Sequence, residues 1–349
     1  MRYIGSKVLL LEQIKKIIDK KVPDAKIFCD IFSGTAVVGR YFKQWYTVFS
    51  NDILFFSYAL QMGTIKNDKT PKFNKLKRIY KIKDPIEYLN NLDTKDMEIL
   101  EKEKRFFQNT YSPKGNKMYL TEENALRIDF IRSKIEEWLN EKVISKLEYF
   151  YLLACIIEGI PYISNISGTY GAFLKKWDKR AYKTYKICRL EITKNNKKNK
   201  CFNENSLNLI KKIEGDILYI DPPYNSRQYA SNYHILETAA LYDYPEVKGK
   251  TVQRKDNINK KSTFCIKKEA LNSFEYLLRK AKFKYIILSY SNEGLINLED
   301  IEKVMKENGK PETFEKYEIP YRRFKSRSTS KEIKLKEIIF FIEKENLCI

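Results

Sequence analysis

The sequence predicts an α/β fold in which helices cover a mostly parallel sheet, with a mostly helical region inserted into the chain. Short apolar runs alternate with amphipathic stretches in residues 1–65 and again in residues 201–349, which is the pattern of repeated βαβ units. Residues 66–144 are highly charged and contain no clear buried strand. We therefore expect a sheet domain built from residues 1–65 and 201–349, and an inserted region at residues 66–200.

The elements of the sheet domain follow from the spacing of apolar residues. Over residues 6–20, apolar residues recur at helical spacing among charged ones, which predicts an amphipathic helix. The other expected elements, in chain order, are a strand at 25–31, a helix to about residue 44, a strand at 46–49, helices at 53–65 and 205–213, a strand at 217–220, helices at 232–242 and 267–281, a strand at 285–288, a helix at 298–308, and strands at 313–319 and 336–343. The last two strands are expected to form an antiparallel pair, and residues 246–262 a long basic loop.

The inserted region is expected to consist of helices separated by turns. Pro71, Pro85 and the turn at residues 112–116 interrupt the helical patterns, because proline lacks the N–H that a helix interior needs. A more apolar helix is expected at residues 146–157, which the pattern allows to pack on the core of the sheet domain. Lysines interleaved with aromatic residues follow at residues 174–200.

The charge balance favours an anionic partner. The 349 residues carry a formal net charge of +21 and an isoelectric point near 9.4, which favours nucleic acid first and an anionic membrane second. A composition rich in Lys, Ile and Asn, as an AT-rich genome produces, is the alternative explanation. No apolar run approaches the roughly 20 residues of a membrane span, so we expect no membrane association.

Cysteine and histidine usage excludes several kinds of site. The six cysteines are scattered and form no CxxC pair, which argues against a zinc site or disulfides and for a reducing cytoplasm. The single histidine, His234, excludes metal sites that need several histidines, and we expect it to be structural. We therefore predict no metal. Lys15 and Lys16 interrupt the first apolar stretch too early for a signal peptide.

The motif with the clearest chemical content is Asp221-Pro222-Pro223-Tyr224. It follows an uncharged run that is expected to be a buried strand, which its two prolines end because they cannot continue a hydrogen-bonded ladder. A rigid turn therefore lies at the carboxyl end of a strand, where open α/β sheets bind their ligands. Its carboxylate, backbone carbonyls and aromatic ring suit a planar base with an exocyclic amine. A plain proline turn is the alternative.

A second candidate site lies in the turn after the first strand, at Asp30, Phe32, Gly34 and Thr35. Small residues between a strand and a helix let the backbone approach a ligand closely. The turn lacks the second glycine of the dinucleotide fingerprint, and Asp30 would repel phosphates. A cationic ligand such as S-adenosylmethionine therefore fits better, and an ordinary tight turn is the alternative.

Asp52 ends the second expected strand, about 20 residues beyond the glycine turn. A carboxylate at this position can accept hydrogen bonds from both hydroxyls of a ribose. It can equally cap the following helix, and the two roles are compatible. At the N-terminus, Gly5 and Lys7 taken alone indicate only a helix cap and a solvated lysine.

Taken in order, these motifs resemble those of a known enzyme family. The motifs are Arg2-Tyr3-Ile4-Gly5-Ser6-Lys7, Asp30-x-Phe32-x-Gly34, Asp52 and Asp221-Pro222-Pro223-Tyr224. This order is similar to that of the Dam-like DNA adenine-N6 methyltransferases, also called the D12 or alpha-order class. Residues 225–229 and 233–237 also resemble the segment after the catalytic motif in type II modification methylases of this class. The resemblance covers about residues 1–65 and 145–300.

The resemblance implies a Rossmann-like class I methyltransferase sheet, with the inserted region at residues 66–200 serving target recognition. It implies a site-specific enzyme that transfers a methyl group from S-adenosyl-L-methionine to N6 of an adenine flipped out of double-stranded DNA. Such an enzyme belongs to a restriction-modification system or acts as a solitary methylase. A cognate restriction endonuclease is then a candidate genetic partner, and a cytoplasmic monomer is expected.

The resemblance also assigns roles to residues. The predicted catalytic residues are Asp221, Pro222, Pro223 and Tyr224. The predicted cofactor-binding residues are Tyr3, Lys7, Asp30, Phe32, Gly34, Thr35 and Asp52. The predicted DNA-binding residues are Lys175, Lys176, Arg180, Arg227, Gln228, Arg322, Arg323, Lys325 and Arg327. Lys7 is assigned to the cofactor carboxylate and Asp52 to its ribose.

Two alternatives remain open. Related turns serve enzymes that methylate an RNA base or a protein glutamine, although the basic insertion and the motif order argue against them. A DNA-binding protein that has lost catalysis would keep the same fold, although the intact Asp221, Tyr224 and Asp52 argue against it.

Overall fold

The computed structural model describes residues 5, 7–320 and 336–344. Their contacts group the chain into two compact units. The sheet unit comprises Lys7–Ile53, Lys197–Gln228 and the described part of Lys261–Ile349. The helical unit comprises the described residue of Met1–Ser6, which is Gly5, together with Leu54–Asn196 and Tyr229–Lys260.

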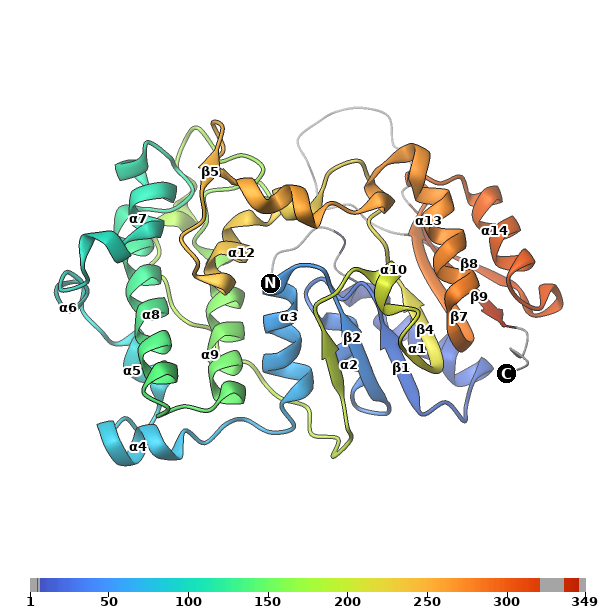
Figure 1. The fold of residues 1–349 in the computed structure, drawn as a ribbon, viewed down its shortest axis with the longest axis horizontal. Coiled ribbons are helices and arrows are strands. Elements are labelled where there is room, and N and C mark those ends of the chain that lie inside the picture. The colour runs from blue at the N-terminus through green and yellow to red at the C-terminus, as the bar shows by residue number, and fades with distance from the viewer. Residues whose placement is uncertain (1–4, 6, 321–335, 345–349) are drawn as a thin grey trace. The chain divides into compact units, whose positions relative to one another are not determined.

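A seven-stranded sheet forms the centre of the sheet unit (Figure 1). In spatial order its strands are β3 (Lys200–Phe202), β2 (Thr47–Asn51), β1 (Ile27–Asp30), β4 (Glu214–Ile220), β7 (Lys282–Ser291), β9 (Lys336–Glu343) and β8 (Glu315–Pro320). The first five run parallel, and β9 pairs antiparallel with both β7 and β8. The predicted parallel sheet with an antiparallel terminal pair is confirmed. The sequence does not predict β3, because three residues are too few to show a period.

Helices cover both faces of this sheet. They are α1 (Leu11–Lys21), α2 (Val37–Phe42), α10 (Ser206–Leu209), α13 (Lys267–Lys280) and α14 (Leu298–Glu307), with the short 3-10 helices η1 (Val8–Leu10), η8 (Thr263–Cys265) and η9 (Pro311–Thr313). Ile18 of α1 shares a buried core with Ile287 of β7. Leu277 of α13 shares the opposite core with Ile286, the neighbouring residue of the same strand. Since successive side chains of a strand point to opposite faces, β7 contributes to both cores.

The order of the strands reverses between β1 and β4. From β1 the sheet continues to β2 and β3, and from β4 it continues to β7. Open α/β sheets bind ligands at such a point, in the crevice outside the carboxyl ends of the strands. Asp30 ends β1 and Asp221 directly follows β4. Both predicted motifs therefore lie at the position where this fold places a ligand.

The helical unit confirms the predicted helices of residues 66–144. Its helices are α3 (Phe55–Gln61), α4 (Asn74–Tyr80), α5 (Pro85–Asn90), α6 (Thr94–Met97), α7 (Phe106–Tyr111), α8 (Glu122–Asn140), α9 (Lys146–Gly159), α11 (Tyr229–Asn232) and α12 (His234–Leu241), with the π-helical turn η2 (Met62–Lys66) and the 3-10 helices η3 (Lys102–Lys104), η4 (Pro113–Gly115), η5 (Ile160–Tyr162) and η6 (Lys179–Tyr182). The α9 helix begins with a capping box formed by Ser145 and Glu148, which satisfies N–H groups that a helix start leaves unpaired. It packs against α3, α8 and α12.

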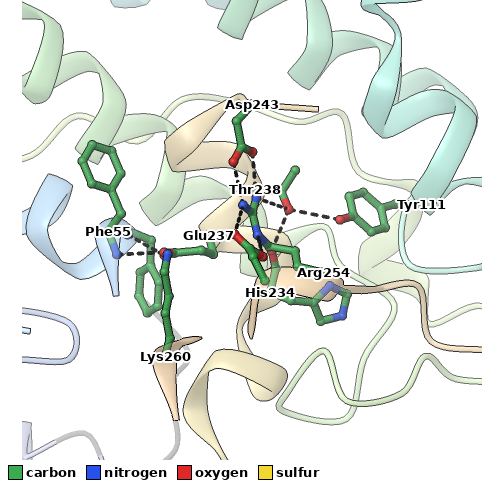
Figure 2. Close-up of polar contacts among 10 residues, drawn as sticks. Phe55, Tyr111, His234, Glu237, Thr238, Asp243, Arg254 and Lys260 are labelled. Atoms are coloured by element: carbon green, nitrogen blue, oxygen red, sulfur yellow. Dashed lines mark hydrogen bonds and ion pairs between the residues drawn. The ribbon is translucent and has the colours of Figure 1, made fainter. Parts of the chain in front are cut away.

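A buried carboxylate ties α12 to the start of α3 (Figure 2). Glu237, whose side chain is 1% exposed, accepts hydrogen bonds from the backbone N–H groups of Phe55 at 3.0 Å and Phe56 at 2.9 Å. It also pairs with Lys260. A carboxylate at a helix N-terminus satisfies unpaired N–H groups and complements the helix dipole, so this contact fixes α12 against α3.

Part of the segment predicted as a basic loop, residues 246–262, is ordered by a buried arginine. It forms the strands β5 (Val247–Lys248) and β6 (Gln253–Arg254) and the 3-10 helix η7 (Lys255–Lys260). The fully buried Arg254 bonds to Asp243 at 2.6 Å and to Asp256 at 2.7 Å (Figure 2). The prediction of a loop throughout is wrong, because two-residue strands show no periodicity and their anchor is a tertiary ion pair.

Gly63 marks the closest approach of η2 to α9, and its replacement tests this packing. A Cβ atom at residue 63 would lie 2.5 Å from Ala154 Cβ and 2.6 Å from the backbone oxygen of Phe150. We expect Gly63→Ala to lower the free energy of unfolding by about 1–3 kcal/mol through overpacking, as measured by urea denaturation. Gly168→Ala is the control, because no atom lies within 4 Å of the Cβ position there. Equal stability of the two variants would contradict the prediction.

Candidate active site

The predicted catalytic turn lies at the carboxyl end of β4 and contacts residues that belong to or follow β7. Residues Ile217–Ile220 are buried, and the side chain of Asp221 is 17% exposed. The backbone oxygen of Tyr224 accepts a hydrogen bond from Leu295 N at 3.1 Å. Its ring packs edge-on against Tyr290 with centroids 6.1 Å apart. The turn therefore presents a carboxylate and an aromatic ring on a fixed backbone.

Lys7 links the Asp221 carboxylate to a second carboxylate on β9. Lys7 Nζ lies 3.0 Å from Asp221 Oδ1 and 2.8 Å from Glu337 Oε1. Glu337 Oε1 also accepts a hydrogen bond from Ser289 Oγ at 2.9 Å. Burial disfavours the charged ammonium, but Asp221 and Glu337 raise the pKa of Lys7 well above its ordinary value. Lys7 therefore remains charged, beside the predicted catalytic carboxylate.

Three effects, which do not all act in the same direction, set the protonation of Asp221. Burial raises the pKa of its carboxyl, Lys7 lowers it and Glu337 raises it, so that the pKa reaches about 7. Among the described residues, Lys7 bonds to Oδ1 and nothing bonds to Oδ2. One oxygen of a carboxylate that titrates near neutrality is therefore left to accept a hydrogen bond.

Asp30, at the end of β1, is a buried carboxyl that lacks partners. Its side chain is 1% exposed, and neither carboxyl oxygen has a hydrogen-bond partner in the described part of the chain. Burial, Asp221 and Asp52 raise the pKa of Asp30 to about 8, against a lowering by the nearby donors of Ser33 and Phe32. A buried polar group without a partner is destabilising unless a ligand provides donors or positive charge. The site therefore fits a cationic ligand, as the sequence predicts.

The turn after β1 is shaped by residues in the left-handed region of backbone space. Gly34 has φ +51° and Ala36 has φ +59°, which glycine tolerates and alanine rarely adopts. The Gly34 N–H donates to Asp52 Oδ2 at 2.8 Å, so Asp52 holds this turn from the end of β2. The ring of Phe32 packs against Phe264 with centroids 5.1 Å apart. The structure thus brings together the described residues predicted to bind cofactor.

Asn51 connects the ends of β1, β2 and β3, a role that sequence reasoning missed. Its amide nitrogen donates to the backbone oxygens of Ile31 and Glu204, each at 3.1 Å, and its side-chain oxygen accepts from Glu204 N. It is 1% exposed. Its position next to Asp52 was the available signal, because a buried amide at the end of a strand must satisfy its hydrogen bonds within the loops around it.

The predicted DNA-binding residues differ in their surroundings. Lys175 and Lys176 are exposed on the helical unit, where Arg180 is partly buried and lies 3.7 Å from Asp178. In the sheet unit Arg227 is exposed, whereas the Gln228 side chain is held by Ser262 N and Ser262 O at 2.8 and 3.1 Å. Five predicted residues lie outside the described residues: Tyr3, Arg322, Arg323, Lys325 and Arg327.

His234 is fully buried, with Nε2 3.0 Å from the backbone oxygen of Tyr170. Burial lowers its pKa to about 4, so the ring is neutral at pH 7 and packs among aromatic side chains of the helical unit. Within the described ranges, no three or more His, Cys, Asp or Glu side chains are placed to hold a metal ion. No described helix has the length and apolarity needed to cross a membrane.

Comparison with known proteins identifies the relatives of this chain. Residues 3–304 match the profile of a family described as D12 class N6 adenine-specific DNA methyltransferase. The chain is 51% identical over 348 residues to Type II methyltransferase M.FokI of Planomicrobium okeanokoites, covering 99% of the chain and 53% of that protein. It is 45% identical over 346 residues to Modification methylase StsI of Streptococcus sanguinis, covering 99% and 52%.

A third relative is covered almost completely. The chain is 36% identical over 335 residues to Type II methyltransferase M.NlaIII of Neisseria lactamica, covering 94% of both proteins. In contrast, the chain spans about half the length of the first two relatives. The matches include β1, β2 and β4 with the turns that follow them.

Proposed function

The chain belongs to the D12 class of N6 adenine-specific DNA methyltransferases, and we propose from this that it transfers a methyl group from S-adenosyl-L-methionine to N6 of adenine in double-stranded DNA. The observation that carries the proposal is the placement of Asp221, whose Oδ2 has no partner among the described residues, within electrostatic range of the buried carboxyl of Asp30. The names of the relatives suggest a type II modification enzyme of a restriction system. A cognate endonuclease is then its genetic partner.

The residues of the turn act on the target base. The lone pair of N6 is delocalised into the adenine ring, which makes the amine a poor nucleophile. Asp221 Oδ2 and the backbone oxygen of Pro222 accept one N6 hydrogen each, which localises the lone pair on nitrogen. Tyr224 stacks on the base, and Pro223 keeps the turn rigid. As N6 gains the methyl group it loses one proton, which the Asp221 carboxylate accepts. Positioning and electrostatic stabilisation therefore supply most of the catalysis.

The turns after β1 and β2 are proposed to hold the cofactor. S-adenosylmethionine supplies an electrophilic methyl group on a sulfonium when bound. A positively charged ligand favours the ionised form of the Asp30 carboxyl, which then pairs with it, and Asp52 accepts hydrogen bonds from ribose hydroxyls. Phe32, Gly34 and Thr35 are proposed to contact the cofactor, as is Tyr3, which the resemblance assigns to it. Lys7, which the sequence assigns to the cofactor carboxylate, has one N–H left beyond its two ion pairs.

DNA binding is proposed to use basic and polar residues other than those of the two turns, with residues 66–200 serving target recognition. The net charge of +21 supports attraction to phosphates. The proposed contacts are Lys175, Lys176, Arg180, Arg227, Gln228, Arg322, Arg323, Lys325 and Arg327. The adenine must leave the duplex to reach Asp221, so the enzyme is proposed to flip it. None of the five described cysteines forms a disulfide, which supports a cytoplasmic enzyme, and we propose that it acts as a monomer.

Methyl transfer is expected to weaken on the acid side of pH 7. Asp221 must be ionised to accept the N6 hydrogens, and its pKa is about 7, so the active form is lost as the pH falls through this value. We expect kcat/KM, which reports groups of the free enzyme, to fall about tenfold per pH unit below pH 7 and to level off above it. Initial rates between about pH 5.5 and 9 test this. A profile that is flat through pH 7 would argue against the role of Asp221.

Transfer of tritium from labelled cofactor tests the function itself. Purified protein is incubated with double-stranded DNA, RNA or a protein mixture, and labelled DNA is digested to nucleosides. The proposal predicts N6-methyldeoxyadenosine from DNA. Label in RNA or protein alone would overturn it in favour of the related transferases. DNA binding without transfer to any acceptor would instead identify a catalytically inactive DNA-binding protein.

A further inference from the structure

We propose that Glu337 is a positioning residue for methyl transfer. By sharing the Lys7 ammonium with Asp221, it keeps one Asp221 oxygen free and basic enough to accept a hydrogen bond from the target amine. The inference rests on the proposed function of the turn at Asp221. Glu337 lies outside residues 3–304 that match the family profile.

The topology of the sheet brings Glu337 to this site. The strand order β4-β7-β9 places β9 two strands from the catalytic turn, and β9 runs antiparallel to β7. Its first residues therefore lie at the edge where the parallel strands end. Glu337 is paired in register with Ser291, the last residue of β7. Asp221, directly after β4, lies at the same edge.

Lys7, Asp221 and Glu337 form a largely buried group of ion pairs. Lys7 is 3% exposed and Glu337 4%, and Lys7 Nζ is 2.8 Å from Glu337 and 3.0 Å from Asp221. Glu337 has no other cation within ion-pair distance among the described residues. A buried carboxylate is destabilising unless it is paired with a cation. Lys7 is therefore the shared ion-pair partner of Asp221 and Glu337. The other groups that face Lys7 are Tyr219 and Tyr224, the latter with its ring centroid 5.3 Å away.

Because Lys7 also pairs with Glu337, it attracts the Asp221 carboxylate less strongly than it would alone. If Glu337 carried no charge, the whole attraction of Lys7 would fall on Asp221, which would hold its proton less tightly and accept hydrogen bonds more weakly. Glu337 raises the pKa of Asp221, against the lowering by Lys7. Asp30 also lies within electrostatic range of Asp221. Glu337 thus helps to keep Asp221 basic near neutral pH.

Glu337→Gln tests this role, because it removes the charge and keeps the shape. We expect kcat above pH 8 to fall about tenfold, because Asp221 becomes a weaker acceptor. We also expect the acid limb of the pH–rate profile to move to lower pH by about one unit. The Asp221 carboxyl, observed by carbon NMR in free protein with labelled aspartate and assigned by its loss in Asp221→Asn, should titrate at lower pH in the variant.

Glu318→Gln is the matched control. Glu318 lies on the adjacent strand β8, is 45% exposed and pairs with Lys336, so the same chemical change should leave the pH profile and the NMR titration unaltered. A fall in rate without movement of the acid limb and of the Asp221 titration would overturn the proposal in favour of a merely structural role. If Glu337→Gln does not fold, Glu337→Asp keeps the charge at a greater distance and should shift the titration in the same direction, by less.

The experiment separates this inference from the proposed function. Absence of methyl transfer by the wild-type protein would reject the function, and the Asp221 titration in the free protein would still decide whether Glu337 controls it. Normal wild-type transfer with an unchanged titration in Glu337→Gln would reject the inference alone.

Discussion

Asp221→Ala is expected to lower kcat for methyl transfer to DNA by about 10³-fold or more, while the dissociation constant for S-adenosylmethionine stays within about threefold of the wild-type value. The variant lacks the carboxylate that accepts the N6 hydrogen, whereas Asp30, Asp52 and the Gly34 turn remain. Initial rates with tritiated cofactor and calorimetric titration of the cofactor measure the two quantities separately.

A second variant separates lost charge from lost shape. Asp221→Asn retains the shape of the side chain, but its amide nitrogen can only donate a hydrogen bond, so a comparable loss of rate is expected. Asp24→Ala serves as the control, because Asp24 is exposed near the start of β1. Loss of cofactor binding together with normal residual turnover would reverse the assigned roles of the two turns.

Asp30→Asn is expected to stabilise the protein and to weaken cofactor binding. An unfolded chain loses the proton of this carboxyl near pH 4, whereas the folded protein keeps it until about pH 8. Between these values unfolding releases a proton, so wild-type stability falls as the pH rises and stops falling above about pH 8. An asparagine at this position has no carboxyl proton, so the stability of the variant does not fall in this way as the pH rises. We expect a gain of up to about 5 kcal/mol above pH 8, none at pH 4, and about 10- to 100-fold weaker binding of S-adenosylmethionine.

Thermal unfolding at pH 4 and pH 8 and calorimetric titration of the cofactor test both parts. Asp24→Asn is the control, since an exposed carboxylate is expected to change neither stability nor affinity. Unchanged stability at pH 8 would show that the Asp30 carboxyl is compensated in the free protein. Unchanged affinity would remove Asp30 from the cofactor site.

The sequence predicted the parts of the fold that depend on local pattern. The apolar spacing predicted α1 and α13, and the uncharged run before Asp221 predicted β4, because buried helices and strands each impose a period on the chain. The proline turn and the glycine turn were recognisable for the same reason, since backbone geometry restricts the residues that can occupy them. The order of these motifs was sufficient to predict the family.

The failures of sequence reasoning concern contacts between distant residues. The three-residue β3 and the hairpin β5–β6 are too short to show a period, and the hairpin depends on the buried pairing of Arg254. Asn51 connects three loops, which only the sheet order brings together. The sequence indicated a solvated lysine or a cofactor contact at Lys7, whereas the structure places it between two carboxylates.

By itself, therefore, the sequence determined the class of fold, the family and the two turns at Asp30 and Asp221, because these depend on residue type and order along the chain. Only the tertiary structure decided the electrostatics around them. The pKa of a buried carboxyl depends on which charges lie within a few ångströms, and Glu337 reaches Lys7 only because β9 returns antiparallel beside β7. Strand order, which no local pattern encodes, therefore adds the effect of Glu337 to those of burial and Lys7 on the basicity of Asp221.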